Sequence, residues 1–400
     1  MTKNTCVLAL ALTVFTSIPV FAQQNNNAIV ESLNSAIRPI EILKGDSSFN
    51  DINFLQETLK SKEIIALGEV THGTAEVFDY KDRLARFLVT NLGYRAIAFE
   101  ADFIAIEHID NYITGKTDSI IPAAGTAIRM TNNSMIEWLK RYNRDKIASD
   151  KVHVYGLELR NYTNIFNKML ATFPDLDSSD KGLMTAYLAK PFNSKITKEE
   201  VKGVKAIVLK LQALPLSDIN RQYLDMLEQL NASDAKRGYR DSYMAKNAEW
   251  IKERAKHRKL IVWAHNGHLK KTESYNYPTL GTQLDKKFGS KYYVIGTDFN
   301  SGKAYVNIYV ARNKPLLGFQ PHYYPAVKSD RWYEYFFTQC KYKNFILDIE
   351  VASKDPILKD FLEKPLNMRN IGAWSIPEGE KRSISKNFDL IVYFDKTTSI

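Results

Sequence analysis

An acid and a histidine three positions apart provide the first candidate chemistry in this sequence. Glu69 and His72 lie in the segment Gly-Glu-Val-Thr-His-Gly, between Gly68 and Gly73. Glycine permits a tight turn and lets a ligand approach the backbone closely. A carboxylate beside an imidazole raises its basicity, which suits a general base that takes a proton from water. A histidine in such a turn can equally be structural, since turns hold many satisfied polar side chains.

Four more ionisable residues occur in two other short segments. His265 and His268 belong to the segment His-Asn-Gly-His, although the whole chain has only 7 histidines. Glu100 and Asp102 follow an apolar run. Asp102 is placed either to cap a helix that begins at Phe103 or to act in a site. Glu100 ends an apolar strand, so its charge requires a partner.

Five short apolar runs are expected to form the strands that position these groups. The runs cover residues 64–67, 96–99, 152–157, 260–264 and 292–295. Helical patterns separate several of them, for example over residues 75–91. Strands that are apolar throughout and alternate with helices predict an α/β fold with a central, largely parallel sheet and flanking helices. Ligands bind at the carboxyl ends of such strands, where four of the runs are followed by Glu69, Glu100, Glu158 or His265.

The rest of the chain contains further helical and strand patterns. Residues 29–60 look like two amphipathic helices. Residues 161–257 contain no convincing strand and predict a helical insertion, which either roofs the ligand site or packs apart from it. The proline-rich span 314–325 is expected to be a loop. Three more strands are expected at residues 303–311, 345–349 and 390–394.

The first 22 residues have the pattern of a secretory signal peptide. Lys3 gives a basic start, an apolar run covers residues 7–14, and Val-Phe-Ala provides a cleavage site that ends at Ala22. We therefore expect a mature chain of residues 23–400, periplasmic or secreted and without a membrane anchor. The mature chain would keep one cysteine, Cys340, and so could form no intramolecular disulfide.

Charge distribution and missing motifs exclude several classes of protein. The net charge is +10, but lysine and arginine are spread among acidic residues and form no stripe for nucleic acid. The sequence has no Gly-x-Ser-x-Gly, no His-Glu-x-x-His, no P-loop and no dinucleotide fingerprint. What remains is water-based chemistry by histidine and glutamate on a small molecule, in a monomer or weak oligomer.

Six segments of the chain, taken in order, resemble the erythromycin esterases, which open the macrolactone ring of macrolide antibiotics. The segments are Leu-Gly-Glu-Val-Thr-His-Gly-Thr (67–74), Ala-Phe-Glu-Ala-Asp (98–102), Glu-Trp-Leu-Lys-Arg-Tyr-Asn (137–143), Arg-Asp-Ser-Tyr-Met-Ala-Lys-Asn (240–247), Trp-Ala-His-Asn-Gly-His (263–268) and Met-Arg-Asn-Ile-Gly (368–372). The resemblance implies that His72 is the general base and that Glu69 orients it. It also implies that Glu100 and His265 line the site, and that no metal or other cofactor is needed.

The same resemblance suggests substrate-binding residues. His268 and Asp102 are candidates because they lie in the matching segments. Lys81 stands in the helix where the family usually has arginine. Lysine keeps the positive charge but loses the planar fork that makes bidentate contacts. Arg129 lies near a second position at which the family usually has arginine. A structural role is expected for Arg240 and its neighbour Asp241.

Two other functions fit the same residues. A metal-dependent hydrolase of another ester or amide would use acids and histidines as ligands for zinc or manganese. Its candidate ligands are Glu69, His72, Glu100, His265 and His268. The erythromycin esterase fold also resembles that of certain haem-binding proteins, so a non-enzymatic haem- or ligand-binding module is the third possibility. A haem binder needs only an axial ligand, and the pairing of Glu69 with His72 favours chemistry.

Overall fold

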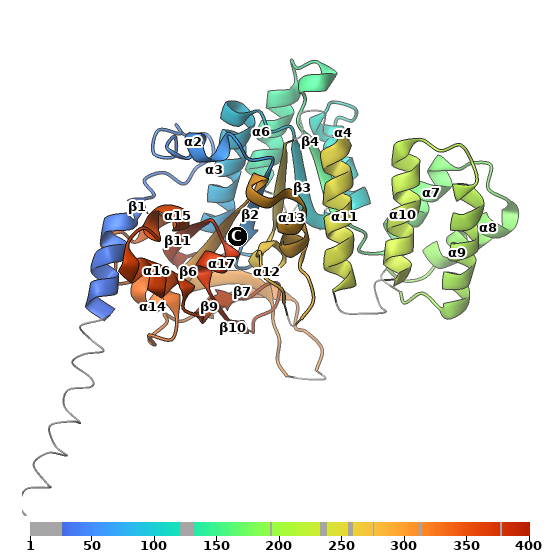
Figure 1. The fold of residues 1–400 in the computed structure, drawn as a ribbon. Helices are drawn as coiled ribbons and strands as arrows, with labels where there is room; N and C mark the ends of the chain where they lie inside the picture. Colours follow the sequence, from blue (N-terminus) through green and yellow to red (C-terminus); the bar gives the residue numbers. More distant parts are fainter. Residues whose placement is uncertain are drawn as a thin grey trace, which may run out of the picture. The chain divides into compact units, whose positions relative to one another are not determined.

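The computed structural model describes residues 26–120, 132–192, 194–232, 238–254, 259–274, 276–311, 314–376 and 378–400. The expected signal peptide and Arg129 lie outside these residues. The fold is α/β, with nine strands in a mixed, largely parallel sheet and many helices (Figure 1). The predicted fold class is therefore confirmed.

The chain divides into two compact units, which are described separately. The first unit comprises the described residues of Met1–Glu41, Glu69–Val77 and Ile295–Ile400. The second unit comprises those of Ile42–Gly68 and Phe78–Val294.

Four strands of the second unit follow the order β2, β5, β3, β4. Their bounds are β2 (Ile64–Glu69), β3 (Ala96–Asp102), β4 (His153–Glu158) and β5 (Leu260–His265). Strand β3 pairs in parallel with both β4 and β5. Every residue of β2, β3 and β5 is buried. Strands covered on both faces must be apolar throughout, which is why their sequences predicted them well.

Helices connect and flank these strands. They are α2 (Leu55–Leu59), α3 (Ala75–Leu92), α4 (Phe103–Ile113), α6 (Asn133–Asn143), α12 (Asn266–Leu269) and α13 (Leu280–Phe288), with short 3₁₀ helices η2 (Ala148–Asp150) and η3 (Gly289–Lys291). The helix expected over residues 75–91 is confirmed. The Asp102 carboxylate caps α4 by accepting a hydrogen bond from the Ala105 amide at 3.0 Å, as expected for this position.

The described residues between 161 and 254 are helical and contain no strand. The helices are α7 (Tyr162–Thr172), α8 (Ser178–Leu188), α9 (Lys198–Gln212), α10 (Asp218–Ala232) and α11 (Tyr239–Arg254). Helices α7 to α10 share one apolar core, and Figure 1 shows them grouped beside α11. Helix α9 begins with a capping box, in which the Thr197 side chain and Glu200 satisfy each other's backbone amides. The suggested roof over a ligand stays a prediction.

The first unit has the strand order β1, β8, β11, β6, with β7 on the other edge of β6. The bounds are β1 (Arg38–Pro39), β6 (Tyr292–Asn307), β7 (Phe319–Tyr324), β8 (Asn344–Asp348) and β11 (Leu390–Thr397). Strand β11 runs parallel to β6 and antiparallel to β8. A separate ribbon joins β9 (Leu366–Asn370) and β10 (Glu378–Arg382). The helices are α14 (Tyr333–Phe337), α15 (Ile349–Ala352), α16 (Pro356–Glu363) and α17 (Ile384–Asn387).

Three local predictions were correct only in part. The strand expected over 303–311 is present over 303–307, where it is the second half of β6, which continues through Gly302 at φ +133° and ends at Asn307. The loop expected over 314–325 contains β7, because its Pro321 lies in a strand that pairs on one side only. Of the two helices expected over 29–60, residues 26–36 form one, but the other is limited to the five residues of α2.

Among the described residues, no helix is both long and apolar enough to cross a bilayer.

Candidate active site

Glu69 and His72 form a close pair in the first unit. The Nδ1 atom of His72 lies 2.6 Å from Oε1 of Glu69. The Glu69 side chain is fully buried, whereas 14% of the His72 side chain is exposed. A carboxylate on Nδ1 holds the proton of neutral imidazole at that nitrogen, which leaves the basic lone pair on Nε2. This is the arrangement that a general base requires.

Backbone contacts within the first unit hold the turn around His72. The Tyr305 amide in β6 donates to the Gly73 carbonyl at 2.9 Å. The Thr71 hydroxyl donates to the Gly372 carbonyl at 2.7 Å. A Cβ atom on Gly73 would lie 2.1 Å from the Tyr305 carbonyl oxygen. The close approach expected from this glycine is therefore made by strand β6 and not by a ligand, and it fixes the position of the neighbouring histidine.

Exposed apolar side chains surround the end of the same β6 strand. Tyr305 stacks on Phe319, with ring centroids 6.0 Å apart, and Tyr309 stacks on Trp374 at 6.2 Å. We call these exposed apolar residues the aromatic surface: Val310, Leu316, Leu317, Phe319, Tyr323, Trp374 and Ile376. An isolated exposed apolar side chain is ordinary, but stacked rings together with further exposed apolar side chains are typical of a binding surface. Sequence reasoning missed this surface, because hydropathy alone predicts burial for these residues.

The second unit holds a network of charges around Arg240 in α11. Its guanidinium contacts Glu158 through two hydrogen bonds of 2.6 and 2.7 Å. A third bond of 2.7 Å joins it to Oε1 of Glu100. We call the following residues the Arg240 cluster: Glu100, Glu158, Arg160, Arg240, Asp241 and His268. Burial would raise the pKa of Glu158, but attraction to Arg240 and Arg160 outweighs it and lowers the pKa.

His268 is enclosed by charged partners in this cluster. Its Nδ1 lies 2.8 Å from Asp241, and its Nε2 lies 2.9 Å from Arg240 and 3.4 Å from Glu100. A protonated Nε2 is repelled by Arg240 and attracted by Glu100. The cluster has three carboxylates and two guanidiniums, so a positive His268 balances its charge. Burial lowers the pKa of His268, but the carboxylates of Glu100 and Asp241 raise it further, to about 9. The carboxylates therefore make His268 easier to protonate than an ordinary histidine.

The other predicted site residues of the second unit have defined structural contacts. His265 caps α12 through its Nδ1, and its own amide donates to Glu100 at 2.9 Å. Asp102 accepts hydrogen bonds from the amides of Ala105 and Arg160. Lys81 is buried, with its ammonium 4.1 Å from the centroid of the Trp263 ring. The predicted roles of these residues in binding or catalysis stay predictions.

The structure thus brings Glu69 to His72 in one unit, and Glu100 to His265 and His268 in the other. Sequence reasoning missed Glu158 and Arg160 as members of a site. The place of Glu158 at a strand end was the available signal. Among the described residues, no group of three or more His, Cys, Asp or Glu side chains is arranged to hold a metal ion. The guanidinium of Arg240 occupies the space between the two buried glutamates.

Comparison with known proteins identifies the family. A family model described as "Erythromycin esterase" matches residues 89–397. The chain belongs to the erythromycin esterase family. The matched span includes Glu100, His265 and His268 and begins after the Glu69–His72 pair. The protein is therefore a hydrolase of this family.

Individual relatives are distant. The Bacillus subtilis (strain 168) protein YbfO, named for an unconfirmed hydrolase activity, is 26% identical over 64% of this chain and 69% of that protein. Erythromycin esterase type II of Escherichia coli is 24% identical over 66% of this chain and 75% of that protein. A crystal structure of a Bacillus cereus protein superposes with a TM-score of 0.74 and 26% identity, covering 94% of this chain and 98% of that one.

Proposed function

We propose that this protein hydrolyses the macrolactone ester of macrolide antibiotics such as erythromycin, with a water molecule activated by His72. The observation that carries the proposal is the 2.6 Å contact between His72 and the buried Glu69. Nε2 takes a proton from water while the water oxygen attacks the ester carbonyl. Glu69 orients the ring and stabilises the imidazolium that forms, as carboxylates do in other histidine-based hydrolases.

The second half of the reaction returns the proton. The tetrahedral intermediate collapses, the bond between the carbonyl carbon and the ring oxygen breaks, and the imidazolium gives its proton to the departing alkoxide. The products are a carboxylate and an alcohol on one opened chain. This sequence consumes one water and needs no cofactor. His72 acts first as base and then as acid, so one histidine can serve both steps.

The aromatic surface supports an apolar substrate. It belongs to the same unit as His72, and the Tyr305 amide in β6 bonds directly to the residue after His72. A macrolactone presents a large apolar ring, which gains binding free energy when it covers exposed aromatic side chains. We propose Trp374, which is 51% exposed, as one contact. Trp374→Ala should raise KM for a macrolide several-fold and leave kcat for a small ester unchanged.

The test is incubation of purified protein with erythromycin, followed by mass spectrometry for a product heavier by one water. A small chromogenic ester serves as a second substrate, and His72→Asn as the inactive control. Hydrolysis of erythromycin that depends on His72 supports the proposal. Activity on the small ester alone would overturn the macrolide substrate, and no activity on any ester would overturn ester hydrolysis itself.

We further propose that the protein is exported, with cleavage after Ala22, on the pattern of its first residues. Fractionation of expressing cells and determination of the amino-terminal residue test this directly. An uncleaved cytoplasmic product would contradict it.

A further inference from the structure

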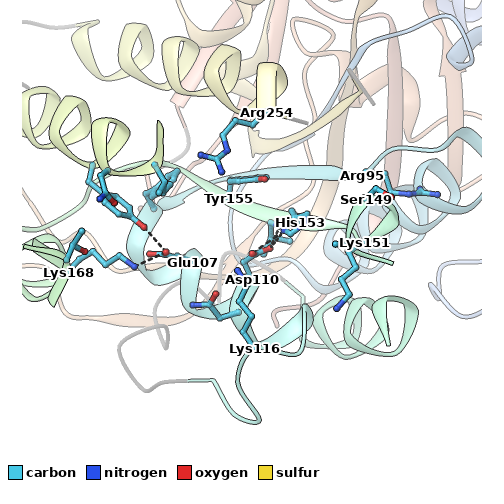
Figure 2. Close-up of a pocket in the computed structure, with 18 residues that line it drawn as sticks. Arg95, Glu107, Asp110, Lys116, Ser149, Lys151, His153, Tyr155, Lys168 and Arg254 are labelled. Atoms are coloured by element: carbon cyan, nitrogen blue, oxygen red, sulfur yellow. Dashed lines mark hydrogen bonds and ion pairs between the residues drawn. The ribbon is translucent and has the colours of Figure 1, made fainter. Parts of the chain in front are cut away.

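A cavity lies beside the strands that carry the Arg240 cluster, and its lining extends from the start of β3 and β4 to Phe103, which follows β3. It has a volume of about 550 Å³ and belongs wholly to the second unit (Figure 2). Arg95 precedes β3 and His153 begins β4, and both line the cavity. The seven residues of β3 span roughly 20 Å, at about 3.3 Å per residue. Glu100 and Asp102, at the carboxyl end of β3, do not line the cavity, although Phe103 next to Asp102 does.

Cationic side chains dominate the walls of this cavity. Five lining residues are lysine or arginine, namely Arg95, Lys116, Lys151, Lys168 and Arg254. Only two are acidic, and both already have partners. Glu107 accepts hydrogen bonds from Lys168 at 2.8 Å and from the Tyr223 hydroxyl at 2.7 Å. Asp110 accepts one from the Val154 amide at 3.0 Å and lies 3.1 Å from His153. The remaining positive charge favours an anionic ligand.

Several of these cations keep donors for a ligand. Lys116 is exposed and forms no side-chain ion pair or hydrogen bond with any residue that the structure describes. Arg254 stacks on the Trp250 ring at 4.9 Å and has no carboxylate partner within the described part of the chain. Lys151 donates to the Thr114 carbonyl at 2.6 Å, which uses one of its three protons. In Figure 2, Arg254 lies on one side of Tyr155, and Lys151 and Lys116 lie on the other.

The cavity also has an apolar side. Phe103 and Tyr223 meet edge to face, with ring centroids 6.1 Å apart, and Tyr155 and Ile219 complete this wall. Aromatic walls favour a ring-shaped ligand body, while arginine forks and lysine ammonium groups bind phosphate oxygens. An inorganic anion alone would leave the aromatic wall unused, and a neutral ring would leave the cations unused.

We propose that this cavity binds a small organic phosphate, a phosphate monoester carried on a planar ring. The phosphate lies between Lys116 and Lys151, and the ring covers Tyr155, with Arg254 on the other side of Tyr155. The ligand binds without reacting. This binding site is separate from the site of ester hydrolysis, and the test of one does not depend on the test of the other. Glu107 limits affinity, because its carboxylate repels the anion.

Isothermal titration calorimetry of the full-length protein in low-salt, phosphate-free buffer tests the proposal with four probes: phenyl phosphate, inorganic phosphate, benzoate and benzyl alcohol. Phenyl phosphate is expected to bind saturably and more tightly than each of the others. No saturable binding of phenyl phosphate at millimolar concentration would overturn the site. Equal or tighter binding of benzoate would overturn the phosphate class, and equal binding of inorganic phosphate would overturn the role of the aromatic wall.

Charge-removing variants locate the binding. Lys116→Gln and Lys151→Gln should each weaken phenyl phosphate binding about fivefold or more, because each removes a charge-assisted contact. Lys205→Gln removes the same charge from an exposed position on α9 and should change nothing. Glu107→Gln should tighten binding, while its amide oxygen still accepts the Tyr223 hydroxyl. Equal weakening by Lys205→Gln, or weaker binding by Glu107→Gln, would show that the phosphate binds elsewhere.

Discussion

His72 and His268 show how neighbouring charges decide what a histidine can do. His72 contacts one buried carboxylate through Nδ1, at 2.6 Å. His268 lies against two carboxylates and a guanidinium, and its pKa rises to about 9. Both ring nitrogens of His268 already contact charged side chains, so neither is open to take a proton from water, but the ring helps to hold the carboxylates around it. We therefore assign the base to His72 and an electrostatic role to His268.

The same contrast applies to the two glutamates that hold these histidines. Glu69 is held against one imidazole, as in a catalytic dyad. Glu100 bonds to Arg240, to His268 and to the amide of His265, as in a structural network. Removing a residue from the network should mainly reduce stability, and removing one from the dyad should mainly reduce activity.

Arg240→Ala should have the largest effect on stability. The Arg240 side chain is 37% exposed, but its partners Glu100 and Glu158 are only 4% and 9% exposed. The variant leaves two buried carboxylates without their main partner, and the free energy of unfolding should fall by about 3 kcal/mol. Chemical denaturation measures this. Arg160→Ala is the matched control. Because the Arg160 side chain is 46% exposed, its removal should lower the free energy of unfolding by less than about 1 kcal/mol. Equal losses in both variants would contradict a central role for Arg240.

Glu69→Gln should have the next largest effect, on activity. The amide keeps the shape of the carboxylate but not its charge, so the imidazolium loses its stabilising partner. We expect kcat/KM for ester hydrolysis to fall about 10- to 100-fold. Glu76→Gln is the control, since Glu76 binds Thr397 and Thr398 and no histidine. A wild-type kcat/KM in the Glu69→Gln variant would show that the Glu69 carboxylate does not take part in the reaction.

The parts of the fold that could be predicted from the sequence are segments in which every residue is buried to a similar degree. Buried parallel strands produce continuous apolar runs, so β2, β3, β4 and β5 were found with their polar ends. The Glu69–His72 pair was also predictable, because only three positions separate its members. Strand β7 was missed because edge strands tolerate proline and carry no apolar run.

The Arg240 cluster could be predicted only in part. Arg240 and Glu158 are 82 positions apart, and no local sequence pattern predicts their contact. The sequence did place Glu158 at a strand end. Charge pairing across such a distance depends on how α11 packs against β4, which is a property of the tertiary structure. The cationic cavity was missed for the same reason, since its five lysines and arginines come from five separate stretches of chain.

A smaller effect is expected in the pH dependence of stability. The pKa of His268 is about 9 in the folded protein, against an ordinary value of 6.5. A raised histidine pKa stabilises the fold fully below pH 6.5, and this contribution is lost as the pH rises through 9. The difference in Tm between wild type and His268→Gln should therefore be larger at pH 6 than at pH 10. A difference that stays constant or widens at high pH would show that His268 is neutral in the folded protein.

The central claim is that His72, and not His268, is the general base. The most direct test compares kcat/KM for erythromycin, or for a small ester, among wild type, His72→Asn and His268→Asn at neutral pH. General-base catalysis contributes about 10²- to 10⁴-fold, so His72→Asn should lose that much activity with almost no change in Tm. His268→Asn should lose far less. If the wild-type protein is active and the His72→Asn variant has the same kcat/KM, the assignment of His72 as the general base is contradicted.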